Sequence, residues 1–228
     1  MARRLNAKSA KSLILMDLTV CETFTSLMGE STLAGLPAFF IRLTGCNLRC
    51  RYCDTAYAYE GGQTRSLESL VAEACGSAAR LVLVTGGEPL LQEGTPLLLA
   101  NLIQAGLEVI LETNGTLPIQ GIDSRVRRIV DLKCPGSGMS HHIFWANLAI
   151  LTFRDEVKFV ITDKDDFDWA VEVVKRHGLA DRVPVLISPV FGSLPLAEAA
   201  AWIVNSGLPL RLNVQLHKYI WGPEVRGV

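Results

Sequence analysis

Short apolar stretches alternate along this chain with helix-like stretches, and this alternation constrains the fold more than any other feature. The extended stretches are predicted at residues 13–24, 38–43, 81–84, 108–112, 128–132, 157–161, 183–187 and 210–216. The helix-like stretches begin at residue 66 and cover 96–105, 165–177 and 197–205. Such an order predicts an α/β fold with a parallel sheet and right-handed crossovers. Because polar residues and glycines follow strand after strand, we expect a partial TIM-like barrel of about six parallel strands with helices outside, and a site at their carboxyl ends.

The composition is that of an ordinary globular protein. Of the 228 residues, 49% are hydrophobic and 20% are charged, and the formal net charge is −1. No strong field therefore attracts nucleic acid or a membrane surface. The apolar runs are too short to span a bilayer, and the first residues lack the apolar core of a signal peptide. We predict one cytoplasmic domain over residues 1–228, with 1–12 as a loose tail, and neither nucleic acid nor membrane as a partner.

Three cysteines, Cys46, Cys50 and Cys53, lie within eight residues in a C-x3-C-x2-C spacing. Thiolates so close together can converge on one metal centre, and a structural zinc ion requires four protein ligands. An iron–sulfur cube held by three thiolates leaves one iron for an exogenous chelating molecule. A non-enzymatic zinc-binding module is the alternative. The remaining cysteines are scattered and need no function as buried or half-buried thiols: Cys21, Cys75 and Cys134.

A glycine pair follows the predicted strand 81–84, in the sequence Thr85-Gly86-Gly87-Glu88-Pro89. Glycines at a strand end let the backbone approach a ligand closely, although a tight turn into the next helix explains a lone pair equally well. With Tyr52 as the aromatic residue of C-x3-C-x-aromatic-C, the cysteine loop resembles that of the radical S-adenosylmethionine superfamily. The Gly-Gly-Glu-Pro sequence is similar to that superfamily's second signature. The resemblance implies a 4Fe–4S cluster on the three cysteines, with S-adenosylmethionine on the fourth iron.

Further stretches narrow the resemblance, which runs from about residue 22 to the end of the chain. Leu27-Met28-Gly29-Glu30, Cys53-Asp54-Thr55, Glu112-Thr113-Asn114-Gly115, Asp131-Leu132-Lys133 and Gln215-Leu216-His217-Lys218 together resemble the 7-carboxy-7-deazaguanine synthases. That family converts 6-carboxy-5,6,7,8-tetrahydropterin to 7-carboxy-7-deazaguanine, a step toward queuosine. The resemblance implies hydrogen abstraction from C6 of the pterin, ring contraction of the substrate radical, and loss of ammonia. It also implies Mg²⁺ as a third cofactor.

The resemblance assigns residues of this chain to three binding roles. The substrate would be contacted by Leu27, Met28, Gly29, Glu30, Arg42 and Thr85. The S-adenosylmethionine would be contacted by Tyr52, Cys53, Asp54, Gly87, Ser137, Ser188, Pro189, Val190 and Phe191. Thr55 would be the protein ligand of Mg²⁺, a cation that keeps mostly water and substrate oxygens. A planar guanidinium at Arg42 suits a pterin or its carboxylate, and Arg42 and Glu30 are expected to face one another across the substrate.

Simpler explanations exist for single residues. Glu30 fits an ordinary solvated loop carboxylate, Thr55 a helix cap, and His217 a structural histidine. The family usually has Gln-Gly-Glu-Gly where this chain has Met28-Gly29-Glu30-Ser31, so the chain departs from the family pattern at positions 28 and 31. The adjacent His141 and His142 are expected on the surface, and no element is predicted for 139–153.

The resemblance also implies partners. They are the small pterin substrate, an electron donor such as flavodoxin or ferredoxin, and a second copy of the chain in a homodimer. The alternative enzyme is an activating enzyme that abstracts hydrogen from a glycine of a partner protein. It would share the cysteine loop and Gly-Gly-Glu-Pro, but it would not need Arg42 and Glu30 for a pterin or Thr55 for magnesium.

Overall fold

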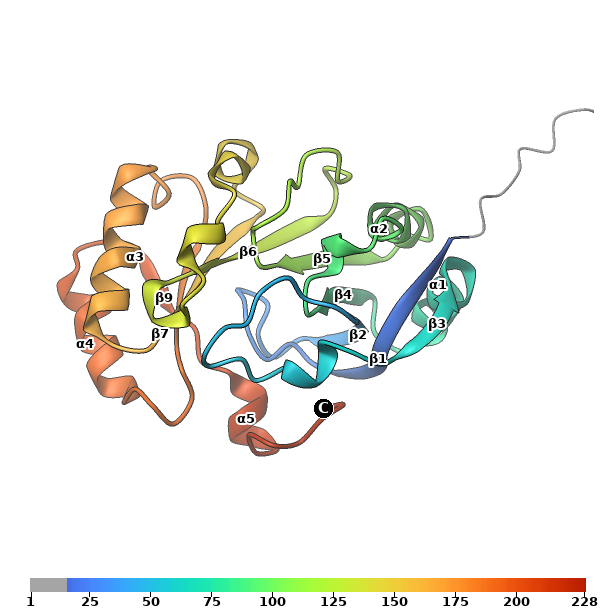
Figure 1. Cartoon of the computed structure of the whole chain (residues 1–228), viewed down its shortest axis with the longest axis horizontal. Coiled ribbons are helices and arrows are strands. Elements are labelled where there is room, and N and C mark those ends of the chain that lie inside the picture. Colours follow the sequence, from blue (N-terminus) through green and yellow to red (C-terminus); the bar gives the residue numbers. More distant parts are fainter. Residues whose placement is uncertain (1–15) are drawn as a thin grey trace, which may run out of the picture.

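All nine strands of the described chain belong to one sheet, in the order β3-β1-β2-β4-β5-β6-β7-β8-β9 (Figure 1). The structure is a computed structural model, and it describes residues 16–228. The predicted tail 1–12 lies outside the described residues. The strands are β1 (Asp17–Leu27), β2 (Pro37–Leu43), β3 (Gln63–Ser66), β4 (Leu81–Gly86), β5 (Glu108–Thr113), β6 (Arg127–Lys133), β7 (Glu156–Ile161), β8 (Val185–Pro189) and β9 (Leu210–Leu212). The α-helices are α1 (Leu67–Gly76), α2 (Thr95–Gln104), α3 (Lys164–Arg176), α4 (Leu196–Asn205) and α5 (Leu216–Ile220).

The parallel part of the sheet runs from β2 through β4 to β9, which makes seven strands, one more than the approximate prediction. β1 pairs antiparallel with β2, and β3 pairs antiparallel with β1. The sheet is open, because its outermost strands β3 and β9 do not pair with one another. The expected incomplete barrel with outer helices is therefore confirmed.

The outer face of the sheet carries the main apolar core. Every second residue of the parallel strands is buried there, such as Ile41 in β2, Val84 in β4 and Phe159 in β7. Helix α3 shows how this face is covered: Asp163 caps its first turn by accepting from the backbone N–H of Asp166, and Phe167 lies on its buried side. Figure 1 shows α3 and α4 outside the β7–β9 side of the sheet and α2 beside β5.

The inner face changes character along each strand. Toward the amino ends it is apolar, with Phe40, Leu83, Ile110 and Ile129 in a second buried cluster. Toward the carboxyl ends the same face turns charged or polar: Arg42, Thr85, Glu112, Asp131, Lys133 and Lys158. The partial barrel thus has an apolar layer near the amino ends of its strands and a charged layer above it, which forms the floor of the cavity described below.

The loop between β1 and β2 fills part of this interior. Met28 is buried in the inner cluster. The backbone N–H of Ser31 donates to Asn213 Oδ1 over 2.9 Å, and the Thr32 hydroxyl donates to Glu156 Oε1 over 2.5 Å. These contacts tie the loop to the β7–β9 side of the sheet and hold Glu30 above the floor.

Several element boundaries differ from the prediction. β1 continues to Leu27, beyond the predicted end at 24, because its pairing with β2 extends to Leu27, opposite Pro37. β3 was missed because its four residues are all polar and pair only with β1. The last strand ends at Leu212 rather than 216, since α5 already begins at Leu216. The unassigned stretch 139–153 contains two short 3-10 helices, Ser140–His142 and Trp145–Ile150.

Candidate active site

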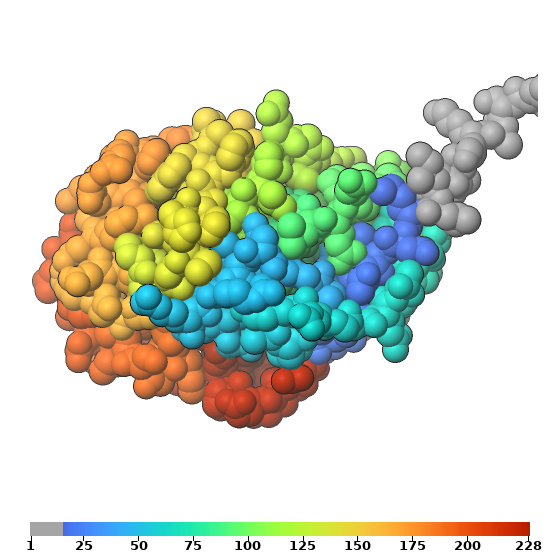
Figure 2. Space-filling view, in the orientation of Figure 1, coloured from blue at the N-terminus to red at the C-terminus, as the bar shows by residue number. Residues whose placement is uncertain are grey.

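A cavity of about 880 Å³ opens at the carboxyl ends of the parallel strands. The cysteine loop closes one side of it and the C-terminal segment another. In Figure 2 the light-blue and cyan cysteine loop lies at the surface between the yellow-green segment after β6 and the red C-terminal end. The predicted site residues that line this cavity are Leu27, Met28, Gly29, Glu30, Arg42, Cys46, Cys50, Tyr52, Cys53, Asp54, Thr55, Thr85, Gly87, Ser188, Pro189, Val190 and Phe191.

Ser137 is the one predicted site residue that does not line the cavity. Its side chain is buried, and its hydroxyl donates to the Cys134 carbonyl over 2.6 Å. Its carbonyl accepts from the backbone N–H of Arg51 in the cysteine loop, over 3.1 Å. The structure therefore gives the Ser137 backbone a part in holding this loop.

The cysteine loop follows β2 and is fixed by its own backbone. The N–H of Gly45 donates to the Ala58 carbonyl over 2.8 Å, and the N–H of Leu48 donates to Cys46 Sγ over 3.4 Å. The Arg49 guanidinium donates to the Cys46 carbonyl and lies 4.1 Å from the centroid of the Tyr59 ring. These contacts turn all three cysteines of the motif toward the cavity.

The surroundings of two of these thiols disfavour the charged thiolate. Burial raises the pKa of Cys46, and burial raises the pKa of Cys50 to about 11 against the opposing charge of Lys133. A thiolate here thus needs a metal centre to stabilise it. Within residues 16–228, no three Cys, His, Asp or Glu side chains surround a single metal ion. An iron–sulfur cube instead binds each cysteine through a different iron, so the three cavity-facing thiols fit it.

The Gly-Gly-Glu-Pro turn packs directly against the cysteine loop. The backbone N–H of Glu88 donates to the Gly45 carbonyl over 2.7 Å. The Glu88 carboxylate is fully buried and accepts from the Thr113 hydroxyl over 2.9 Å and the Asn114 N–H over 2.7 Å. Burial raises the pKa of Glu88, which these hydrogen bonds oppose. The turn therefore links the ends of β4 and β5 to the loop that carries the cysteines.

Arg42 and Glu30 line the same cavity but have separate partners. Arg42 Nε donates to Glu22 Oε1 over 2.7 Å, and the Tyr57 hydroxyl donates to the same oxygen over 2.9 Å. Glu30 Oε2 accepts from Lys158 Nζ over 2.8 Å. Each charge is thus already oriented by a counter-charge before any ligand is present.

Sequence reasoning assigned no role to the charged group at the cavity floor. Lys158 also contacts the Glu112 carboxylate and lies 3.4 Å from Asp131 Oδ2, while Lys133 lies 2.9 Å from the same Asp131 oxygen. Burial alone would lower the pKa of Lys158, but the carboxylates around it raise that pKa well above its ordinary value. The sequence does contain a signal for this group, because Lys158 is a charged residue between the apolar residues Val157 and Phe159 of β7.

The C-terminal segment closes over the site. Asp54 Oδ2 accepts from Lys218 Nζ over 2.6 Å and from Gln215 Nε2 over 2.9 Å. The backbone N–H of Leu216 donates to the Gly29 carbonyl over 2.8 Å. The ring of His217 packs so closely on Gly29 that a Cβ there would lie 2.0 Å from its Nδ1. Partial burial lowers the pKa of His217, and the charge of Glu30 opposes this shift.

The geometry argues against two of the simpler explanations, those for Thr55 as a helix cap and for His217 as a structural histidine. Thr55 precedes the short 3-10 helix Ala56–Ala58, but its side chain makes no capping hydrogen bond and donates to Asp54 Oδ1 over 2.9 Å. His217 lines the cavity, so it is not a histidine enclosed in the core. His141 and His142 are both exposed on the surface, as expected, with their rings 4.1 Å apart.

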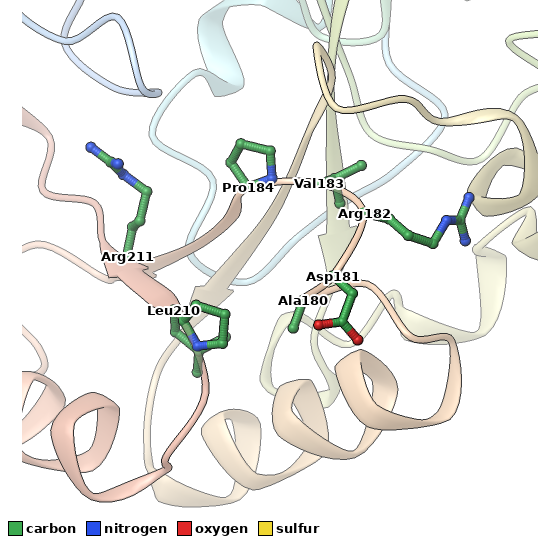
Figure 3. Close-up of a pocket in the computed structure, with 8 residues that line it drawn as sticks. Ala180, Asp181, Arg182, Val183, Pro184, Leu210 and Arg211 are labelled. Carbon is green, nitrogen blue, oxygen red and sulfur yellow. The ribbon is translucent and has the colours of Figure 1, made fainter.

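A second hollow of about 560 Å³ lies at the opposite, amino end of β8 and β9 (Figure 3). Its walls are the 180–184 turn and residues 209–211. Arg182 points away from it and donates to the Leu148 carbonyl over 2.9 Å. It holds no cluster of convergent polar groups, so the chemistry of this chain belongs to the larger cavity.

Residues 40–190 match the radical SAM superfamily. The chain is 42% identical to a 7-carboxy-7-deazaguanine synthase of Chlorobaculum tepidum, over 92% of this chain and 97% of the relative. It is 39% identical to one of Koribacter versatilis, over 92% of this chain and the whole relative. The chain therefore belongs to the 7-carboxy-7-deazaguanine synthase family of the radical SAM superfamily.

Solved structures show the same fold. The crystal structure of QueE from Escherichia coli superposes with a TM-score of 0.70 at 24% identity, covering 87% of this chain and 93% of that one. Streptococcus suis SuiB bound to S-adenosylmethionine gives a TM-score of 0.56 at 12% identity, over 78% of this chain and 50% of that one. Membership of the superfamily implies a 4Fe–4S cluster and S-adenosylmethionine as cofactors. No helix in the described part of the chain has the length and apolar composition needed to cross a bilayer.

Proposed function

We propose that this chain converts 6-carboxy-5,6,7,8-tetrahydropterin to 7-carboxy-7-deazaguanine with loss of ammonia. One observation carries the proposal: the cavity that receives the three cysteines also receives Arg42 and Glu30, each held by a counter-charge. A pterin has an edge of amino and ring N–H groups that a carboxylate can accept in pairs, and its own carboxylate suits a guanidinium. The family relatives support the same activity.

The residues of the chain then have distinct tasks. Cys46, Cys50 and Cys53 hold the cluster, which with bound S-adenosylmethionine supplies the radical that removes hydrogen from the substrate. The Ser188 to Phe191 segment, Tyr52, Asp54 and Gly87 line the part of the cavity assigned to S-adenosylmethionine. The Tyr52 hydroxyl donates to the Val160 carbonyl over 3.2 Å, which fixes its ring against the sheet end.

Mg²⁺ belongs to the proposal as the third cofactor, with Thr55 as its protein ligand. The Thr55 hydroxyl lines the cavity and does not cap a helix, which leaves its oxygen available to a cation. Mg²⁺ prefers oxygen ligands and retains several waters. The carboxylate of the preceding residue, Asp54, is already paired with the Lys218 ammonium, so Thr55 is the ligand that we propose.

Three further features complete the proposal. Residues 1–228 form one domain, which is supported by the single sheet through all described strands. The enzyme works in the cytoplasm, because free thiols and an iron–sulfur cluster suit a reducing compartment, and every described cysteine is free. It acts as a homodimer and takes its electron from a flavodoxin or ferredoxin.

Anaerobic turnover tests the function. The reconstituted protein is mixed with S-adenosylmethionine, a strong reductant, Mg²⁺ and the carboxytetrahydropterin, and the deazapurine chromophore and ammonia are followed. Equal amounts of both products support the proposal. Cleavage of S-adenosylmethionine that is unaffected by the pterin, with no deazapurine formed, would refute it. The alternative, activation of a glycyl radical enzyme, predicts hydrogen abstraction from a protein glycine, and the relatives give it no support.

A further inference from the structure

Lys158 is a buried lysine at the floor of the cavity, with carboxylates on three sides. Its side chain is 7% exposed, and its Nζ lies 2.8 Å from Glu30 Oε2, contacts Glu112 Oε1, and lies 3.4 Å from Asp131 Oδ2. An ammonium group has three N–H donors, so it can serve all three carboxylates at once. The partners come from the β1–β2 loop, β5 and β6, and Asp131 is the direct neighbour of Lys158 across β6 and β7.

The fold alone does not require a lysine at this position. Burying an ion pair gains little over an apolar residue of similar volume, and the floor below Lys158 is already apolar. The group contains three carboxylates against two ammonium groups, those of Lys158 and Lys133, which leaves one net negative charge. The carboxylates line the cavity, so this negative charge suits a ligand with N–H donors.

The carboxylates also keep part of their surface open to the cavity. The side chains of Glu30 and Glu112 are 20% and 24% exposed, and both residues line the cavity. Glu30 uses Oε2 for Lys158, so its Oε1 is directed elsewhere. Glu112 uses Oε1 for Lys158 and accepts weakly from the Thr85 hydroxyl at Oε2, over 3.4 Å.

We propose that Lys158 is a positioning residue, which holds the Glu30 carboxylate oriented to accept the N–H groups of the pterin ring. This rests on the proposed function. Glu30 lies on a loop, and the ammonium of Lys158 ties its carboxylate to the sheet. Without that tie, the carboxylate would have to be ordered and desolvated by the ligand itself, which weakens binding.

Equilibrium binding of the pterin tests this inference without turnover. Calorimetry is performed on protein reconstituted with cluster and S-adenosylmethionine, with no reductant. We expect Lys158→Met and Glu30→Gln each to weaken pterin binding about 10- to 100-fold, the size of one charge-assisted hydrogen bond. Iron content and affinity for S-adenosylmethionine should not change. The double variant should bind no more than about threefold more weakly than the weaker single variant, because both act through one contact.

Two further variants control for folding and charge. Lys158→Met combined with Glu112→Gln keeps the net charge of the group, so it should fold and still bind the pterin weakly. Lys164→Met removes an exposed lysine paired with Asp168 and should bind as the parent does. In turnover, Lys158→Met should raise KM for the pterin more than it lowers kcat.

The outcomes separate the two claims. If the parent binds no pterin, the proposed function falls and the inference with it. If the parent binds and the charge-matched Lys158→Met variant binds equally well, the inference alone is overturned. Fully multiplicative losses in the Lys158→Met/Glu30→Gln double variant would also overturn it, because Lys158 would then not act through Glu30.

Discussion

Gly87→Ala should release the cysteine loop, because the absence of a side chain at Gly87 makes room for that loop. A Cβ built on Gly87 would lie 2.2 Å from the Gly45 carbonyl oxygen and 2.7 Å from Cys46 Cβ. Ordinary contacts of this kind lie near about 3.5 Å, so the two segments must separate by roughly 1 Å. Backbone strain plays no part, since Gly87 is not among the glycines with positive φ.

The magnitude follows from the contacts at stake. Overpacking costs about 1–3 kcal/mol, and breaking the 2.7 Å hydrogen bond from the Glu88 N–H to the Gly45 carbonyl costs about 1–3 kcal/mol more. For a chain of this size the free energy of unfolding should fall by about 2–6 kcal/mol, and Tm by roughly 5–20 °C. Because Cys46 moves with the loop, the variant should also retain much less iron after anaerobic reconstitution.

Gly76→Ala is the matched control. No atom lies within 4 Å of a Cβ there, and Gly76 ends helix α1 without a positive φ. Its free energy of unfolding should change by less than about 1 kcal/mol, with iron content unaltered. The reasoning is refuted if Gly87→Ala matches Gly76→Ala in both Tm and iron per chain.

Three further predictions concern cysteines, a buried ion pair and a strained residue. Alanine at Cys46, Cys50 or Cys53 should abolish iron binding, whereas alanine at Cys21, Cys75 or Cys134 should leave iron per chain unchanged; iron loss in the last three would contradict the assignment. Burial opposes the low pKa of Asp155, but the Arg128 guanidinium, which donates to it over 2.8 and 2.6 Å, holds that pKa below its ordinary value of 3.8. The ion pair therefore stabilises the fold above pH 3.8, the ordinary pKa, and this contribution is lost as the pH falls through the lower pKa of the folded state. Urea unfolding of Asp155→Ala should show a free energy of unfolding about 3–5 kcal/mol lower than that of the parent at pH 7, and a weaker dependence on acid. Ser31 has φ +77°, and its hydroxyl accepts from the Leu33 N–H over 2.9 Å. Ser31→Ala loses this hydrogen bond and keeps the backbone strain, so it should be about 1 kcal/mol less stable than Ser31→Gly. Equal stabilities of the two variants would show that backbone strain at residue 31 has no measurable cost.

The parallel sheet and the cysteine loop could be predicted because their signals are local. A buried parallel strand such as Leu81–Gly86 has an apolar run followed by a turn sequence, and both are visible in a window of ten residues. The boundaries were less accurate where tertiary contacts decide them. β3 consists of polar residues that become a strand only because β1 lies alongside.

The charged floor of the cavity could not be derived in the same way. Lys158 and Glu30 are 128 residues apart in sequence, and their contact depends on the β6–β7 register and on the path of the 28–36 loop. Within that loop, Met28 is apolar. Its burial in the inner cluster is what places Glu30 over the floor. Sequence therefore indicated which residues are unusual, while the fold determined their partners.

Arg42 shows how this changes an expectation about binding. Arg42 does not face a bare Glu30: its Nε is held by Glu22, and the Tyr57 hydroxyl supports the same carboxylate. A guanidinium bound through Nε still offers its two terminal nitrogens as a planar fork to a carboxylate, which one lysine ammonium cannot reproduce.

Arg42→Lys should therefore raise KM for the pterin by roughly 10- to 100-fold, equivalent to about 1.5–3 kcal/mol, and leave iron content unaltered. Glu22→Gln retains a neutral acceptor for Nε and should have a smaller effect, of about 1 kcal/mol or less. Steady-state kinetics of both variants at saturating S-adenosylmethionine measure these effects. If Arg42→Lys keeps the parent KM, the arginine is a structural partner of Glu22 and β1. If Glu22→Gln raises KM for the pterin as much as Arg42→Lys does, the orientation of Arg42 by Glu22 matters as much as its two terminal nitrogens, and the smaller effect expected for Glu22→Gln is wrong.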